Sequence, residues 1–291
     1  MRWLTQYRSV TVAAPKRTER TSVVRWCCAL VLGVIICAAL FSGVVTRHAY
    51  DEQVRAQPDA SPSRTFLLGT DELGRDRLAR LLYGSRISLA LAPAAALVSV
   101  LLAALLGGIA GLLGGRWERC ITASSNMTLS LPWLFLLMGV RAALPLNTTP
   151  ELSVSITFAL LGVLGWAGPA QVVRSGVAQI VSSDFVLAAR SRGLSRSRVL
   201  AHHVLPNLRP VLAAQFWTSI PLFILAEANL GMLGLGVSEP LPSLGNLLRG
   251  LETQAAGWQH PFAQYWLFAP VLLLVVVLSC LHVLFPSEVR Q

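Results

Sequence analysis

Long runs without a charged side chain are the feature that most restricts how this sequence can fold. Six of them cover residues 26–45, 87–115, 120–140, 152–173, 210–226 and 253–287. A helix that rises about 1.5 Å per residue needs about 20 residues to cross a hydrocarbon layer about 30 Å thick. Stretches such as 31–40 and 97–106 are apolar on all sides, whereas barrel strands alternate apolar with polar residues. The sequence therefore predicts an all-α polytopic membrane protein with six transmembrane helices.

The composition leaves little chain for anything outside the membrane. Charged residues make up only 13% of the 291 residues, and the AVILMFWYC set makes up 54%. Soluble proteins carry about a quarter charged residues, so this chain cannot cover a sizeable water-facing domain. The formal net charge of +10 would suit a nucleic-acid partner or a membrane topology, and the placement of the charges decides between them.

The basic residues predict the orientation, because Lys and Arg beside membrane spans stay on the cytoplasmic side. With the amino terminus inside, the cytoplasmic segments hold 15 basic and 4 acidic residues, and the external segments hold 9 of each. The charge therefore reports topology and gives no reason to expect nucleic acid. The predicted segments are a cytoplasmic tail (1–22), a first transmembrane helix (23–46), an external loop (47–86), a core of five helices (87–286) with a cytoplasmic loop (174–209), and a cytoplasmic end (287–291).

Several other functions lack the residues they require. The first span has a longer apolar stretch than a signal peptide and no cleavage site after it, so we expect an uncleaved anchor. The five cysteines, at positions 27, 28, 37, 120 and 280, lie in or beside spans and predict neither a disulfide framework nor a zinc site. Lys16 is the only lysine and has no glycine loop before it, which excludes a P-loop for ATP. We expect no catalytic residue, metal or cofactor in this chain.

The cytoplasmic loop contains a predicted pair of short helices that meet at a glycine. Ser182 or Ser183 can cap the first helix, Gly193 supplies a left-handed stop, and Ser195 can cap the second helix. An apolar face is formed by Phe185, Ala188 and Ala189 at i, i+3, i+4 spacing, with Arg190 and Arg192 elsewhere. DNA binding is disfavoured because the segment lies between two membrane spans. An ordinary positive-inside loop would explain the arginines but not the order of the small residues.

That order resembles the EAA loop of ABC importer permeases, in which a short coupling helix docks on an ATPase subunit. Ala188, Ala189, Gly193, Leu205 and Pro206 match its pattern, whereas Leu187 stands where the family usually has Glu. The resemblance implies that the ATPase-docking residues are Asp184, Phe185, Ala188, Ala189, Arg192, Gly193 and Ser195.

Further motifs resemble the peptide-type branch of these permeases, closest to the C-type permease of oligopeptide and dipeptide importers. They occupy residues 68–76, 80–89, 227, 230–237, 240–246 and 266–270, and the resemblance runs from about residue 66 to 286. It implies a type I ABC importer fold in the bacterial cytoplasmic membrane that works by alternating access. The implied partners are a B-type permease, two ATPases carrying ATP and Mg²⁺, an external peptide-binding protein, the peptide and membrane lipid. Nickel or another small solute is the same-fold alternative, and an ion-coupled carrier is the alternative from another class.

The motifs of residues 68–76 and 227 supply the candidate external or gating residues. Gly69, Asp71, Gly74, Arg75 and Asp76 are implied to meet the external binding protein. The alternatives are turn formation by the glycines and cation binding by the acids, although neighbouring arginines offset the acidic charge and the spacing is not that of an EF-hand.

Glu227 is the one acid in a predicted span, and an intramembrane carboxylate is costly enough to suggest a function. Two roles remain open for Glu227, a structural hydrogen bond and a part in the path or external gate.

Overall fold

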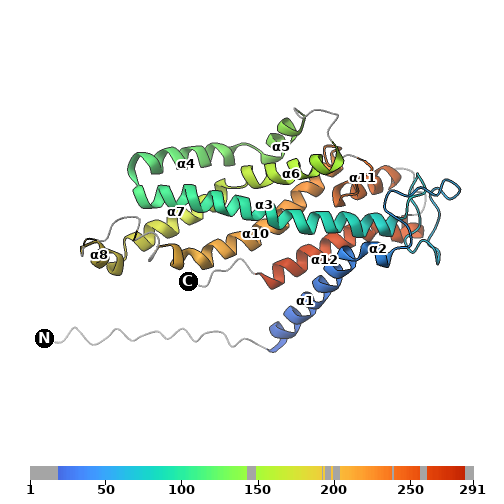
Figure 1. Ribbon diagram of the computed structural model, residues 1–291, viewed down its shortest axis with the longest axis horizontal. Helices are drawn as coiled ribbons and strands as arrows, with labels where there is room; N and C mark the ends of the chain where they lie inside the picture. The colour runs from blue at the N-terminus through green and yellow to red at the C-terminus, as the bar shows by residue number, and fades with distance from the viewer. Residues whose placement is uncertain are drawn as a thin grey trace.

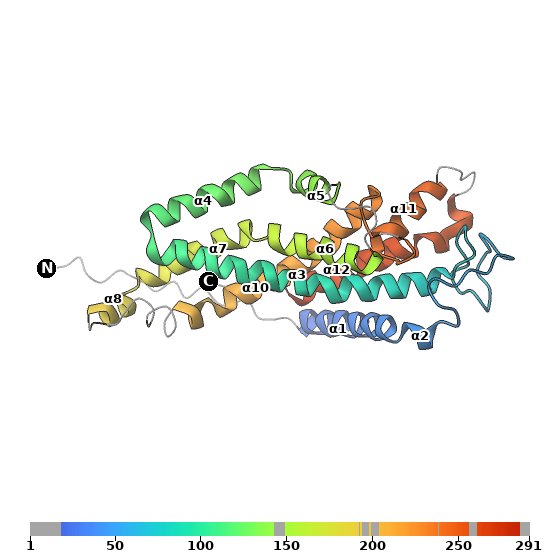
Figure 2. The ribbon, with the colours of Figure 1, turned by 45° about the horizontal axis from the view of Figure 1, so that its top comes forward.

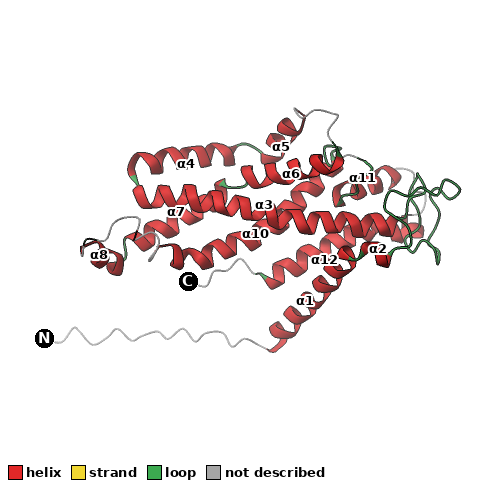
Figure 3. Ribbon diagram, in the orientation of Figure 1, coloured by secondary structure: helices red, strands yellow, loops and turns green. Residues whose placement is uncertain are grey.

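The computed structural model describes residues 19–142, 149–191, 193, 198, 204–237, 239–255 and 261–285. This part of the chain is a bundle of helices without a β-strand (Figure 3), in agreement with the predicted all-α class. The helices are α1 (Glu19–Leu40), α2 (Ser42–Val45), α3 (Arg77–Leu113), α4 (Gly115–Ser130), α5 (Trp133–Ala142), α6 (Pro150–Leu164), α7 (Ala167–Val181), α8 (Asp184–Ser191), α10 (Leu205–Met232), α11 (Leu244–Ala255), the 3₁₀ helix η2 (Pro261–Phe268) and α12 (Ala269–Leu284).

Five helical segments in the described residues are long and apolar enough to cross a membrane. They are Val23–Leu40, Arg77–Leu113, Pro150–Val181, Pro206–Met232 and Gln264–Leu284. The predicted count of six is not confirmed, because the run 120–140 divides into α4 and α5 at Pro132; together these two helices lead from the end of α3 back along the bundle towards α6 (Figure 1). Proline disfavours helical backbone in the residue before it, and Leu131 is extended, with ψ of 131°.

Helix α3 runs along the centre of the bundle (Figure 1) and begins earlier than the sequence suggested. It has 37 residues, which corresponds to about 55 Å of helix. Its first residue is Arg77, ten positions before the predicted start at residue 87, so the segment 47–86 is not entirely a loop. The prediction treated charged residues as the ends of helices. Arg80 nevertheless lies within α3, because it is buried and ion-paired there.

The connection between the fourth and fifth predicted spans is also shorter than residues 174–209. Helix α7 continues to Val181 and α10 begins at Leu205. Arg174 stays within α7 because its Nη1 forms an ion pair with Glu118 Oε1 of α4, 2.6 Å away. A charge with a partner can remain inside a helix, which a count of charge-free runs does not anticipate.

Glycines allow α3 and α7 to approach closely. A Cβ atom on Gly111 would lie 2.7 Å from the Arg174 carbonyl oxygen, and one on Gly107 would meet the Ala170 carbonyl oxygen. This spacing of four residues between small side chains is typical of tightly packed membrane helices. Gly107 and Gly111 therefore serve close packing, which joins α3 and α7 into one unit.

The bundle has two distinct ends, and Figures 1 and 2 both place α8 at one and the loop between α2 and α3 at the other. The start of α1 and the end of α12 lie together, since Arg25 Nη2 donates to the Leu284 carbonyl oxygen at 3.0 Å. Helix α1 exposes large apolar side chains such as Trp26 and Leu30, as expected of a helix that faces lipid.

Candidate functional site

Two tight turns shape the loop that precedes α3. Gly69 and Gly74 have φ values of +71° and +76°, in the region that side chains rarely adopt. A Cβ atom on either residue would also collide with a backbone carbonyl oxygen, that of Ala60 or Val54. Both glycines are therefore required by the course of the backbone, which was one of the roles considered for them.

An ion-pair network joins this loop to a segment about 160 residues later in the chain. Arg75 contacts the Asp71 carboxylate through Nε and the Glu239 carboxylate through Nη1, each at 2.7 Å. Arg80 adds a contact from Nη2 to Glu239 Oε1 at 3.0 Å. Both arginines are buried, with 6% and 3% of their surfaces exposed. The network therefore ties the start of α3 to the loop between α10 and α11.

The charges of this network stabilise one another. Burial alone would lower the pKa of Arg75, but the hydrogen bond and charge of Asp71, together with Glu239, outweigh it and raise the pKa. Arg75 thus remains a cation. Glu239 and Arg80 were not among the predicted site residues, and the available signal was an acid next to Pro240, between the motifs 230–237 and 240–246.

Asp76 has a structural position rather than a surface one. Its Oδ1 accepts a hydrogen bond from the Leu78 N–H at 2.8 Å and caps α3. The residue is 2% exposed, and burial raises its pKa despite the two N–H donors. Arg75 and Asp76 are therefore too buried to meet an external protein directly, whereas Glu72 in the same loop is exposed.

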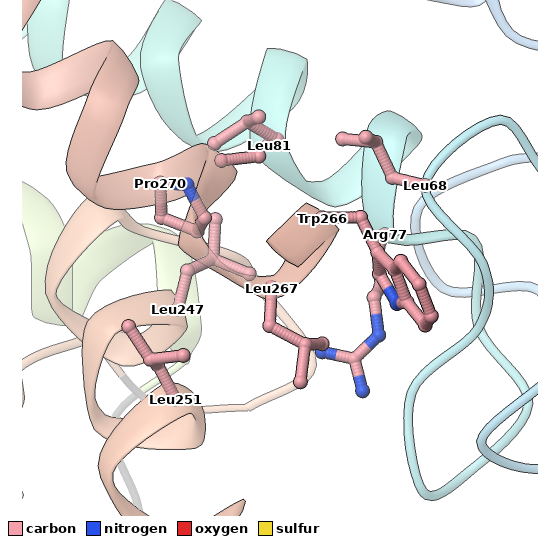
Figure 4. A pocket seen from close by; sticks show the side chains of 9 residues that line it. Leu68, Arg77, Leu81, Leu247, Leu251, Trp266, Leu267 and Pro270 are labelled. Atoms are coloured by element: carbon pink, nitrogen blue, oxygen red, sulfur yellow. The ribbon is translucent and has the colours of Figure 1, made fainter. Parts of the chain in front are cut away.

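The motifs near residues 68 and 266–270 meet at one apolar pocket (Figure 4). It lies between the start of α3, helix α11 and the junction of η2 with α12. Its lining residues are Leu68, Arg77, Leu81, Leu247, Leu251, Trp266, Leu267, Ala269 and Pro270. The motifs that are far apart in sequence therefore build a common structure at this end of the bundle.

Glu227 lies in α10, five residues before the helix ends, and is fully buried. The Ser88 hydroxyl of α3 donates to its Oε2 at 3.3 Å. The Ser243 hydroxyl and the Gly245 N–H also face the carboxyl group, while Oε1 has no hydrogen bond of ordinary geometry among the described residues. Residues from α3, α10 and α11 thus converge on one carboxyl group.

At the opposite end, α8 corresponds to the predicted coupling helix. Val186 is fully buried in an apolar cluster with Val173, Val177, Val204 and Leu208, whereas Asp184 and Ala188 are exposed. Positions 186 and 188 lie about 200° apart around a helix, so one face of α8 packs on the bundle and the other is free. Sequence reasoning missed Val186, which was not distinguished from its apolar neighbours.

The other predicted residues of this segment have mixed outcomes. Gly193 has φ of +82°, which confirms the left-handed stop. The hydroxyls of Ser182 and Ser183 donate to the carbonyl oxygens of Gln179 and Ile180, so both hydroxyls bond to the end of α7. Phe185 and Ala189 belong to α8, while Arg192 and Ser195 lie outside the described residues.

Together, the apolar helices define a polytopic membrane protein, from which one short helix, α8, projects. The family described as binding-protein-dependent transport system inner membrane component matches residues 103–291. The chain belongs to this family of ABC importer permeases, which are membrane subunits that lack an ATP site.

Individual relatives cover most of the chain. It is 32% identical over 219 residues to the oligopeptide transport system permease protein OppC of Bacillus subtilis, covering 75% of this chain and 70% of that protein. It is 32% identical over 248 residues to the dipeptide transport system permease protein DppC of Bacillus subtilis, covering 84% and 74%. It is 30% identical over 201 residues to OppC of Haemophilus influenzae, covering 68% and 63%.

Proposed function

We propose that this chain is one of two permease subunits of an ATP-driven importer that carries oligopeptides or dipeptides into the cytoplasm. The observation that carries the proposal is the similarity to peptide permeases over 248 residues, a stretch long enough to include both ends of the bundle. The chain would lie in the bacterial cytoplasmic membrane, with α8 and both termini inside and the loop before α3 outside. The excess of basic residues in the segments near α8 supports this orientation.

The free face of α8 is the proposed contact with an ATPase subunit. Val186 holds the helix on the bundle, and Ala188 and Asp184 are directed away from it. Figure 1 shows α8 projecting beyond the ends of the longer helices. A small side chain at position 188 lets a partner's backbone approach closely, and the resemblance assigns Phe185, Ala189 and Arg192 to the same contact.

The proposed contact with the external peptide-binding protein lies at the other end. The contact surface would use three exposed acids in and beside the ion-pair network: Asp59, Glu72 and Glu239. The Glu239 side chain is 54% exposed. The buried Arg75 and Asp76 would support this surface from behind. Substrate selection would rest mainly with the external protein, since this chain contributes only part of the path.

Helix α4 is the proposed contact with the second permease. It packs on the bundle through Ser125, whose hydroxyl donates to the Ala167 carbonyl oxygen at 2.7 Å. Away from that contact it exposes Ser124 and Ser130. It also exposes Met127 and Leu129, so its surface is mixed, and the polar part, which is costly in lipid, fits a protein partner or a water-filled path.

Transport would proceed by alternating access. ATP binding would bring two ATPase subunits together and move α8, and the close packing of α3 on α7 would pass that motion to the whole unit. Such a switch requires the ATPases to bind the two states with different affinity.

Co-purification and uptake test this proposal. The chain is expressed with a candidate second permease and candidate ATPases from the same organism, and peptide uptake into proteoliposomes is compared with nickel uptake. Ala188→Arg should abolish both ATPase co-purification and uptake, whereas Ser175→Arg, on an exposed position of α7, should not. Unchanged ATPase binding by Ala188→Arg would overturn the α8 contact. Uptake of nickel but not of peptide would overturn the proposed substrate class. Failure of any ATPase to co-purify would overturn the assignment as an ATP-driven importer.

A further inference from the structure

Helix α11 begins inside the bundle rather than at its surface. Its first residues and the one before it, Ser243, Leu244 and Gly245, are buried, whereas Arg249 and Glu252 further along are exposed. The approach is close: a Cβ atom on Gly84 of α3 would lie 3.3 Å from the Ser243 Cα. The chain therefore leaves α10, returns into the bundle at residue 243 and rises outward again along α11.

A helix that begins in such a place has a specific chemical need. The first N–H groups of a helix have no partner within it, and in a membrane protein buried backbone groups must find acceptors within the protein. The Ser243 hydroxyl oxygen accepts from the Asn246 N–H at 3.2 Å. That bond satisfies one donor only, so the remaining N–H groups at the buried start of α11 require another acceptor.

Glu227 is the polar residue beside these groups, because a Cβ atom on Gly245 would lie 3.0 Å from the Glu227 carbonyl oxygen. The Gly245 N–H and the Ser243 hydroxyl both face its carboxyl group, and Ser88 holds its Oε2 from the α3 side at 3.3 Å. Glu227 is thus placed where the start of α11, the end of α10 and the middle of α3 meet.

A second attachment holds the same returning segment further out. Glu239 binds Arg80 of α3, and Arg80 and Ser88 are eight residues apart, about two helical turns on one face. Helix α3 is therefore connected to residues 239–245 at two points. Near the external end, Arg80 forms an ion pair with Glu239; deeper in the bundle, Ser88 binds Glu227 of α10, which lies beside the start of α11.

We infer that Glu227 is a positioning residue that holds the start of α11 against α3 and α10 and so fixes the external mouth of the permease. Its carboxyl group acts on the backbone of α11 and has no contact with a transported molecule in this role. The consequence for transport rests on the proposed function, but the position of α11 can be measured without it.

Cysteine labelling of α11 tests this inference. Leu244 is 2% exposed, so Leu244→Cys, in a background whose five native cysteines are replaced, should react slowly with a maleimide in the assembled membrane protein. Adding Glu227→Ala should raise the labelling rate at least about tenfold as the start of α11 opens locally. Glu227→Gln, which keeps one acceptor oxygen, should give an intermediate rate, and Glu252→Gln on the exposed side of α11 should leave it unchanged.

The outcomes separate positioning from general instability and from transport. A cysteine at the buried Ala96 of α3 should stay unreactive in the same variants. Equal labelling of Leu244→Cys in the parent, Glu227→Gln and Glu227→Ala backgrounds would overturn the inference, and so would faster labelling at both buried positions. Peptide uptake should fall as the labelling rate rises. A labelling rate of Leu244→Cys that does not change with Glu227→Ala would refute the positioning role of Glu227. Absence of peptide uptake in every variant would refute the proposed function alone.

Discussion

Replacing Val186 with alanine should detach α8 from the bundle without unfolding the rest of the protein. Val186 is the one residue of this eight-residue helix that is fully buried among the described side chains of α8. Helices this short are marginal on their own, so the docked position of α8 depends on packing against Val177, Val204 and Leu208.

The size of the effect follows from the buried surface that is lost. Val186→Ala removes two methyl groups, each contributing about 0.8 kcal/mol by transfer from water, and leaves a small cavity that adds to the cost. The sum is about 2 kcal/mol, which corresponds to a change of about 30-fold in the ratio of docked to undocked α8. ATPase coupling should weaken accordingly.

Hydrogen–deuterium exchange measures this change directly. Amide exchange in residues 184–191 should accelerate by up to about 30-fold, while the middle of α3 keeps its wild-type rates. Val172→Ala is the matched control, because Val172 lies on the neighbouring helix α7 with 43% of its surface exposed. Unchanged exchange in α8 would refute the anchoring role of Val186, and faster exchange throughout the bundle would show that the residue supports the whole fold instead.

Three further predictions concern the α3–α7 contact and the loop before α3. Gly111→Leu should destabilise the protein by about 3 kcal/mol through overpacking, measured by thermal unfolding in detergent, whereas Gly108→Ala, where nothing lies within 4 Å of the added carbon, should be tolerated. Glu239→Gln should lower the free energy of unfolding by about 1 kcal/mol, because the Glu239 side chain is 54% exposed; breaking a fully buried ion pair costs about 3–5 kcal/mol. An unchanged free energy of unfolding in denaturant would contradict a stabilising role of the network. Burial raises the pKa of Asp76 above 3.8, so the folded state binds that proton more tightly and stability should fall as pH rises from 3.8 through the folded-state pKa. Asp76→Asn, which keeps a capping oxygen, should remove this component, and identical pH profiles of unfolding would refute it.

The sequence by itself determined the class of the protein and the approximate positions of most spans. Hydropathy is a local property, and a run of about 20 apolar residues has few stable alternatives to a membrane helix. The left-handed Gly193 and the position of α8 were also readable, because turn and cap residues act within a few positions of themselves.

The tertiary structure decided which charges ended a helix and which stayed inside one. Arg80 and Arg174 occur within helices because partners from distant segments neutralise them, and no local pattern records such a partner. The same holds for the buried start of α11 beside Glu227 and for Val186 beneath α8. Each depends on which surfaces the fold brings together, and that is set by the packing of the whole bundle.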